Sequence, residues 1–249
     1  MLEQSLLFII SFIANAFSAF AGGGAGLLQL PALIFLGLSF SVALATHKLA
    51  SVALGIGATL RHWREGNLNK TFALIMLAAG VPGVILGALG IVHIEDRVAE
   101  IALGILTMGL GLYSVRHPHL GQVLQPSHRD RHGYLIGGIG LFFIGILNGS
   151  LTSGTGLFVT LWLVRWFGMD YKLAVAHTLV LVGLAWNGSG ALTLGLQGAI
   201  LWDWIPVLLI ASLLGGYVGA HMALAKGNKW IKRVYEVVTL VVGIKLIIG

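Results

Sequence analysis

The chain has 249 residues, of which 57% are hydrophobic and 10% are charged, and its mean hydropathy is +0.93. A soluble domain carries about 25% charged residues, so the composition excludes a soluble protein and predicts an integral membrane protein. The lack of cysteine excludes disulfides and thiolate chemistry. The net charge of +6 does not indicate nucleic-acid binding, because the basic residues lie in loops, where the positive-inside rule places them.

The first apolar run, residues 6–20, ends at a break with four glycines, Gly22, Gly23, Gly24 and Gly26. The apolar segment after it, residues 27–38, is too short to span a bilayer as a helix. Glycine lets the backbone turn and expose its N–H groups. Inside a bilayer, such backbone is tolerated only where it is buried in protein or lines a cavity. The break is therefore predicted to be part of a site.

Full-length apolar segments follow at 42–60, 71–92 and 98–115, and then comes the only long polar stretch. The second half has segments at 133–149, 157–167, 173–194, 202–225 and 231–248. A second break, Ser153-Gly154-Thr155-Gly156, lies about 130 residues after the first, and Gly83 and Gly87 match Gly215 and Gly219 at a similar offset. We interpret the chain as two copies of one unit: transmembrane repeat 1 (1–115), a cytoplasmic linker (116–132) and transmembrane repeat 2 (133–249).

The distribution of basic residues decides between parallel and inverted repeats. If each half crossed the membrane four times, the basic loops would divide evenly between the two sides. If each break is instead the tip of a helical hairpin that returns to its starting side, nearly all basic loops share one face, as the positive-inside rule requires. The predicted fold is an all-α polytopic membrane protein with two inverted repeats, each a glycine-tipped helical hairpin plus three transmembrane helices. This is a transporter architecture, with the site at the midplane.

Several polar residues lie within the apolar segments. Thr46-His47 in the first half lies opposite His177-Thr178 in the second, with the order swapped, and Lys48 is expensive to bury unless it is paired or faces water. Asn148 and Asn187 are further polar groups at depth. For the serines, threonines and asparagines, ordinary interhelical hydrogen bonds are the alternative to a site. For both histidines and the lysine we favour a functional cavity, in which one histidine carries a proton or sets the affinity.

Enzyme motifs are missing from the sequence: there is no His-Glu-x-x-His, no Gly-x-Ser-x-Gly, no Walker loop and no pair of intramembrane aspartates. Four histidines of the linker, which include His117 and His128, fit no standard metal spacing. We therefore expect no enzyme, no catalytic residue, no metal and no cofactor.

The sequence resembles the sulfite exporter TauE/SafE family, also called TSUP permeases. The resemblance rests on the glycine-rich break, Leu-x-x-Pro-Ala-Leu, Ala-Leu-Ala-Thr-x-Lys-Leu-x-Ser and a basic loop with Arg-x-x-Gly, and it covers nearly the whole chain. It departs from the family at His47, where a small amide or hydroxyl residue is expected. It implies a permease for sulfite, sulfonates or other sulfur-containing organic anions in the prokaryotic cytoplasmic (inner) membrane.

The function favoured by this resemblance is secondary transport of a small anion, sulfite or an organosulfonate, by alternating access. An anion channel is the alternative, and an intramembrane enzyme is disfavoured by the missing motifs. The expected partners are the anion and the lipid bilayer, with no nucleic acid. The coupling ion, H+ or Na+, and a homo-oligomeric state are left open.

The predicted binding site lies between the two tips. Helix N-termini present N–H groups and a positive dipole end to anions, and inverted repeats would bring the two tips together near the midplane. The residues expected to bind the substrate are Gly24, Ala25, Gly26, Thr46, His47, Lys48, Ser153, Gly154, Thr155, Gly156, His177, Thr178 and Asn187.

The charge asymmetry also predicts both termini outside and the linker inside. Because the chain has no cysteine, a single cysteine in place of Gln122 is a clean probe. It should resist a membrane-impermeant thiol reagent in intact cells and react after permeabilisation, whereas a cysteine in place of Lys245 should react from outside. Labelling at position 122 in intact cells would rule out this topology.

Overall fold

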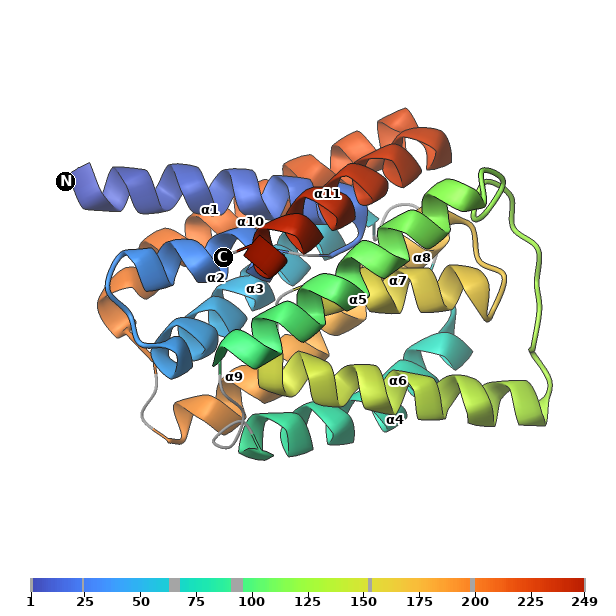
Figure 1. Cartoon of the computed structure of the whole chain (residues 1–249), viewed down its shortest axis with the longest axis horizontal. Coiled ribbons are helices and arrows are strands. Elements are labelled where there is room, and N and C mark those ends of the chain that lie inside the picture. The colour runs from blue at the N-terminus through green and yellow to red at the C-terminus, as the bar shows by residue number, and fades with distance from the viewer. Residues whose placement is uncertain are drawn as a thin grey trace.

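The computed structural model describes residues 2–23, 25–62, 68–90, 96–151, 154–197 and 200–248. Every element in these ranges is a helix, which confirms the all-α class (Figure 1). The elements are α1 (Leu2–Ala21), α2 (Ala25–Phe35), α3 (Phe40–His62), α4 (Lys70–Gly90), α5 (Asp96–Arg116), α6 (Arg131–Leu151), α7 (Thr155–Arg165), α8 (Tyr171–His177), the π-helical segment η3 (Thr178–Trp186), α9 (Asn187–Gly195), the single turn η4 (Trp202–Trp204), α10 (Ile205–Lys226) and α11 (Asn228–Ile248).

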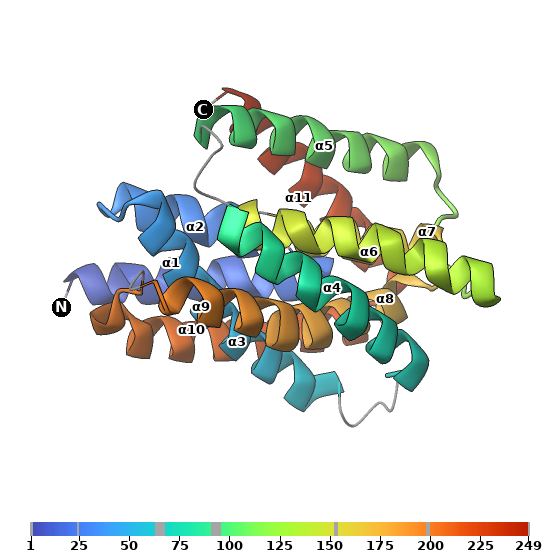
Figure 2. The same ribbon diagram turned by 90° about the horizontal axis from the view of Figure 1, so that it is seen from below.

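Six helices in the described ranges are long and apolar enough to cross a membrane. They are α1, α3, α4, α6, α10 and the continuous helix formed by α8, η3 and α9. Their positions agree with the predicted segments to within a few residues, so the polytopic membrane class is confirmed. The helices α5 and α11, of 21 residues each, pack along each other at one side of the bundle (Figure 2).

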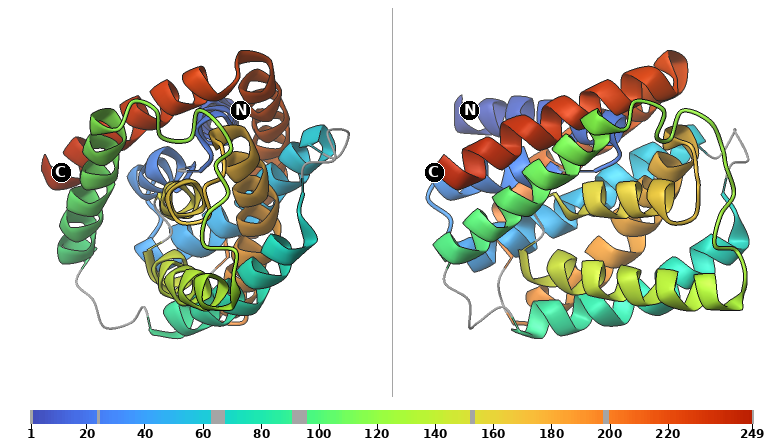
Figure 3. Two further views of the ribbon diagram at one scale, coloured as in Figure 1. Left: turned by 90° about the vertical axis from the view of Figure 1, so that its right-hand side faces the viewer. Right: turned by 45° about the vertical axis from the view of Figure 1, so that its right-hand side comes forward.

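Two helices are half-length, as the glycine breaks predict. Helices α2 and α7 have 11 residues each, or roughly 16 Å at 1.5 Å per residue, which is about half of a bilayer core. Nine residues of α7 are buried, and Figure 3 shows this helix almost end-on inside the ring of the other helices. Its placement agrees with the rule that irregular backbone at membrane depth must be enclosed by protein.

The first helix of each half packs against a helix of the other half. In the first half, α1 packs on α10, and in the second half, α6 packs on α4. Both contacts are made by glycines whose missing Cβ lets a carbonyl oxygen of the partner helix approach. The four glycine–carbonyl pairs are Gly83 with Phe142, Gly87 with Ile146, Gly215 with Phe12 and Gly219 with Ala16. The glycines that match between the two halves of the sequence therefore make matching contacts.

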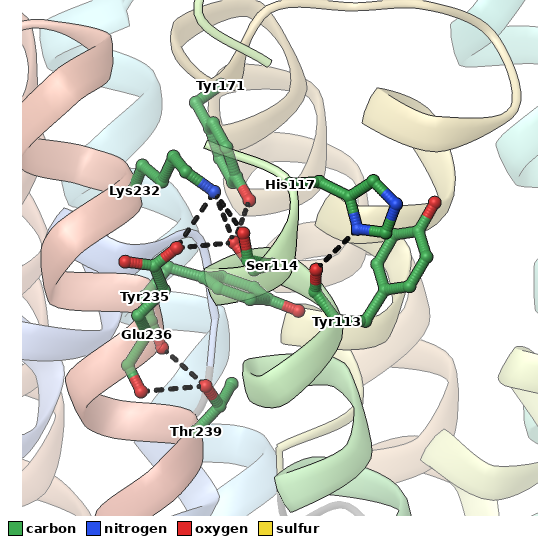
Figure 4. Close-up of polar contacts among 8 residues, drawn as sticks. All are labelled: Tyr113, Ser114, His117, Tyr171, Lys232, Tyr235, Glu236 and Thr239. Carbon is green, nitrogen blue, oxygen red and sulfur yellow. Dashed lines mark hydrogen bonds and ion pairs between the residues drawn. The ribbon is translucent and has the colours of Figure 1, made fainter. Parts of the chain in front are cut away.

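A buried polar cluster fastens α11 to α5 and α8 (Figure 4). The Lys232 ammonium donates to the Ser114 carbonyl and hydroxyl at 2.6 and 2.8 Å and pairs with the Glu236 carboxylate at 2.8 Å. The Ser114 hydroxyl also lies 2.9 Å from Glu236 and 3.1 Å from the Tyr171 hydroxyl. One turn away, Tyr235 donates to the carbonyl of Leu157 in the first turn of α7. The cluster thus anchors the half-helix from its outer side.

The glycine contacts generate a stability prediction. A Cβ on Gly87 would overlap the Ile146 carbonyl oxygen, whereas a Cβ on Gly109 in α5 meets no atom within 4 Å. Gly87→Ala should therefore lower stability by about 1–3 kcal/mol through overpacking. Gly109→Ala should be neutral or slightly stabilising, because alanine favours the helix. Melting temperatures of the two purified variants test this, and equal values would contradict it.

Candidate functional site

The two glycine tips meet in the middle of the molecule. Gly22, Gly23 and Gly154 have φ values of +87°, +135° and +79°, a backbone region that favours glycine. A Cβ on Gly23 would lie 2.5 Å from the carbonyl carbon of Gly156, so the two breaks touch backbone to backbone. The N-terminal turns of α2 and α7 consequently begin at the same place.

A cavity of about 40 Å³ lies at this meeting point. Residues of both tips, of α3, of the end of α6 and of the η3–α9 segment line it. They are Ser18, Gly23, Ala25, Gly26, His47, Ser51, Leu54, Asn148, Thr155, Gly156, Thr178, Leu179, Val182, Gly183 and Asn187. No carboxylate of the described residues is among them, and the described residues contain no group of three or more His, Asp or Glu side chains that could hold a metal ion.

His47 is held by hydrogen bonds on both ring nitrogens. The amide nitrogen of Gln29 donates to Ser11 at 3.0 Å, so its amide oxygen is the group that lies 2.8 Å from His47 Nδ1. An amide oxygen only accepts, which places a proton on Nδ1 and leaves Nε2 as the acceptor facing the Ser51 hydroxyl at 3.3 Å. Nε2 is therefore the nitrogen that can take up a second proton beside the cavity.

Lys48 lies directly behind the cavity and is fully buried. Its ammonium donates to the carbonyl of Asn148 at 2.7 Å and to the amide oxygen of the same residue at 3.1 Å. The Asn148 amide nitrogen in turn donates to Thr155 Oγ1 at 2.8 Å, in the first turn of α7. No ion pair of Lys48 is recorded within the described residues, so the amide of Asn148 links this positive charge to the second tip.

In each of the swapped pairs, Thr46-His47 and His177-Thr178, one residue lines the cavity and the other binds a loop outside it. His47 and Thr178 line the cavity. Thr46 Oγ1 instead accepts from the N–H of Leu201 at 3.0 Å. His177 Nε2 accepts from the N–H of Asn69 at 3.0 Å, and its Nδ1 donates to a carbonyl of its own helix. We call Thr46 and His177 the frame residues. Thr46 binds the loop before α10, and His177 binds the loop before α4, so each fixes a loop of the other half.

Two further groups complete the cavity. The Thr160 hydroxyl donates to the Gly22 carbonyl at 2.6 Å and lies 3.0 Å from the Thr178 hydroxyl, which ties the first tip to α7 and η3. Asn187 is 8% exposed, and its amide oxygen has no hydrogen-bond partner among the described residues. A buried polar atom without a partner is costly, so this oxygen is available to accept a hydrogen bond from water or from another donor.

Seven of the residues predicted from the sequence line the cavity: Ala25, Gly26, His47, Thr155, Gly156, Thr178 and Asn187. Lys48 and Gly154 adjoin it, Thr46 and His177 lie in the frame, and Gly24 and Ser153 lie outside the described residues. Ser18 and Ser51 line the cavity without having been predicted. Ser18 and Asn148 stand about 130 residues apart, so alignment of the two halves could have identified this pair.

The sulfite exporter TauE/SafE family matches residues 7–246 of this sequence. The chain belongs to this family. The match confirms the resemblance carried by the glycine break and the Ala-Leu-Ala-Thr-x-Lys segment, and it spans every helix that lines the cavity.

Curated relatives of this family member carry transporter names. A "Probable membrane transporter protein" of Haemophilus influenzae is 31% identical over 98% of this chain and 94% of its own length. The "Probable membrane transporter protein YfcA" of Escherichia coli K12 is 31% identical over 97% and 88%. A Bacillus subtilis relative, YunE, is 22% identical over 97% and 96% and has the same type of name. No solved structure matches this chain. The family is one of membrane transporters and not of enzymes.

The two histidines should respond differently to substitution. His177→Gln should lower the melting temperature, because the loop before α4 loses its acceptor, a cost of about 1–3 kcal/mol, and should leave transport by the folded protein unchanged. His47→Gln should remain folded and reduce transport, because His47 lines the cavity and His177 does not. Melting temperatures and uptake into proteoliposomes measure the two effects. Reduced transport in His177→Gln alone would contradict this assignment.

Proposed function

We propose that this protein is a secondary transporter of a small anion, that the anion is sulfite, and that transport works by alternating access. The observation that carries the proposal is the convergence of two helix N-terminal turns on one cavity that no carboxylate of the described residues lines, with Lys48 bonded to the lining residue Asn148. A bound anion would supply the negative charge that the described surroundings lack.

Electrostatics support an anion over a cation at this position. Each helix N-terminus contributes about 0.3–1 kcal/mol to the binding of a negative charge at exposed sites, and up to about 2 kcal/mol when partly buried. The Lys48 side chain is bonded to Asn148, and the hydroxyl groups of Ser18 and Ser51 and the amide of Asn187 are within the lining. An oxyanion can accept several such hydrogen bonds at once without a dedicated arginine.

The size of the cavity supports a small substrate. A volume of about 40 Å³ accommodates the equivalent of a few water molecules. Sulfite, with one sulfur and three oxygens, is on this scale, whereas an organosulfonate also carries a carbon chain that would require the cavity to enlarge. Among the sulfur oxyanions suggested by the family name, this conformation therefore favours sulfite.

Two inverted repeats support a carrier mechanism. Figure 1 shows α1 and α6, and likewise α5 and α11, running in opposite directions, and the matched glycine contacts repeat between the halves. In transporters of this design the halves rock around a fixed midplane site. We place the protein in the prokaryotic cytoplasmic membrane, with the linker on the cytoplasmic side.

The purified protein in liposomes tests this function. Sulfite uptake should saturate and should be accelerated by sulfite on the opposite side, as only a carrier requires. Lys48→Met keeps the length of the buried stem but removes its charge, and should reduce uptake by tenfold or more, on the order of 1.4 kcal/mol. Lys245→Met, near the C-terminus, is the matched control and should transport normally. Unsaturable flux without acceleration from the opposite side would indicate the channel alternative.

A further inference from the structure

A second cavity, of about 580 Å³, lies where the linker crosses the ends of α5 and α7. We call it the linker cavity. Its lining comes from the last turn of α5, from the linker and from the α7–α8 connection. It consists of Tyr113, Arg116, His117, Pro118, His119, Leu120, Gly121, Val123, Gln125, Ser127, His128, Val164, Arg165, Gly168 and Met169.

The described lining of the linker cavity contains two arginines and three histidines, and it contains no carboxylate. The nearest carboxylates along the chain, Asp130 and Asp170, do not line the cavity. Each accepts from a helix N-terminal N–H, Asp130 from Gly133 at 3.1 Å and Asp170 from Leu173 at 2.8 Å. The positive-inside rule explains why basic residues lie on this side of the membrane, but it does not explain why five of them gather around one cavity.

Two histidines of the linker cavity are fixed by the residues around them. His117 Nδ1 donates to the Tyr113 carbonyl at 2.8 Å, and His128 Nδ1 donates to the Trp166 carbonyl at 2.8 Å. The His128 ring stacks on Trp166, and the His117 ring is tilted by 33° against Tyr113, with centroids 4.2 Å apart in both pairs. These contacts hold both imidazoles in the cavity wall beside the two arginines.

Arg165 and Arg116 stand on different helices, α7 and α5, and both line this cavity. Arg165 Nε donates to the Tyr113 hydroxyl at 2.6 Å, which fixes the guanidinium while its two terminal NH₂ groups are left for a ligand. Arg116 is the last residue of α5 and is exposed. A guanidinium presents paired donors that match the oxygens of a phosphate group.

The walls of the linker cavity are preformed. Backbone bonds join Gln125 to Gly168 at 2.8 Å and Tyr171 to Gly121 at 2.9 Å, so the linker is fastened across the α7–α8 connection. Beneath it, the cluster of Ser114, Lys232 and Glu236 holds α5 against α11 (Figure 4). A site that is already ordered loses less conformational entropy when a ligand binds.

We propose that the linker cavity binds a phosphate-bearing anion, held by Arg116 and Arg165. Its volume lies in the range of small-molecule and cofactor sites, so the phosphate group belongs to a ligand up to the size of a nucleotide or to an anionic lipid headgroup. The proposal does not depend on sulfite transport. The ligand contacts the last turn of α7, whose first turn lines the transport cavity.

The test uses the purified full chain and three probes: inorganic phosphate, ATP, and nanodiscs with or without phosphatidylglycerol. The phosphate probe should raise the melting temperature, and calorimetry should show its binding directly. Arg116→Gln/Arg165→Gln should weaken binding about tenfold or more. Lys229→Gln, an exposed basic residue outside the cavity, is the matched control and should bind within about twofold of the native protein.

The outcomes separate the ligand sources and the two sites. A response to ATP or phosphate in detergent assigns the site to a soluble ligand, and a response confined to phosphatidylglycerol nanodiscs assigns it to a lipid headgroup. Sulfite affinity should be unchanged in the double arginine variant, which keeps this result separate from the transport cavity. If Arg165→Gln impairs folding through Tyr113, Arg116→Gln alone should still weaken binding. Absence of any response, or equal weakening by Lys229→Gln, overturns the proposal.

Discussion

The architecture depends on the backbone contact between Gly23 and Gly156. Only glycine allows it, because Gly23 has a positive φ and any Cβ there would overlap the opposite tip. The contact brings the N-terminal turns of α2 and α7 to one cavity, where their positive ends oppose each other. The same close approach that completes the fold therefore creates an electropositive position, which is where we propose that the anion binds.

The two halves share a frame but not their cavity chemistry. Thr46 and His177 cap equivalent loops, and Gly87 and Gly219 make equivalent helix contacts. At the cavity, by contrast, His47 stands where the second half has Thr178, and Lys48 stands where it has Leu179. A repeated frame can support alternating access, while His47 and Lys48 come from the first half.

The sequence was sufficient to predict the spans and both tips, because apolar length and clustered glycine report them directly. It was insufficient to decide which histidine faces the cavity. One residue along a helix changes the direction of a side chain by about 100°, so the swapped order of Thr46-His47 and His177-Thr178 sends His177 into the frame. The partners of Lys48 were equally hidden, since Asn148 lies on α6 and only tertiary packing brings it near.

The two half-helices are held with unequal strength. Helix α7 is fastened at both ends: Tyr235 donates to its first turn, and Gln125 and Ser127 of the linker bond to the connection that follows it. Helix α2 ends at Phe35, which is 82% exposed, and it packs mainly on its neighbours α1 and α3. Local opening requires less free energy where fewer buried contacts must break. A rearrangement that opens the cavity therefore disrupts less structure at α2 than at α7, and a ligand in the linker cavity would increase that difference.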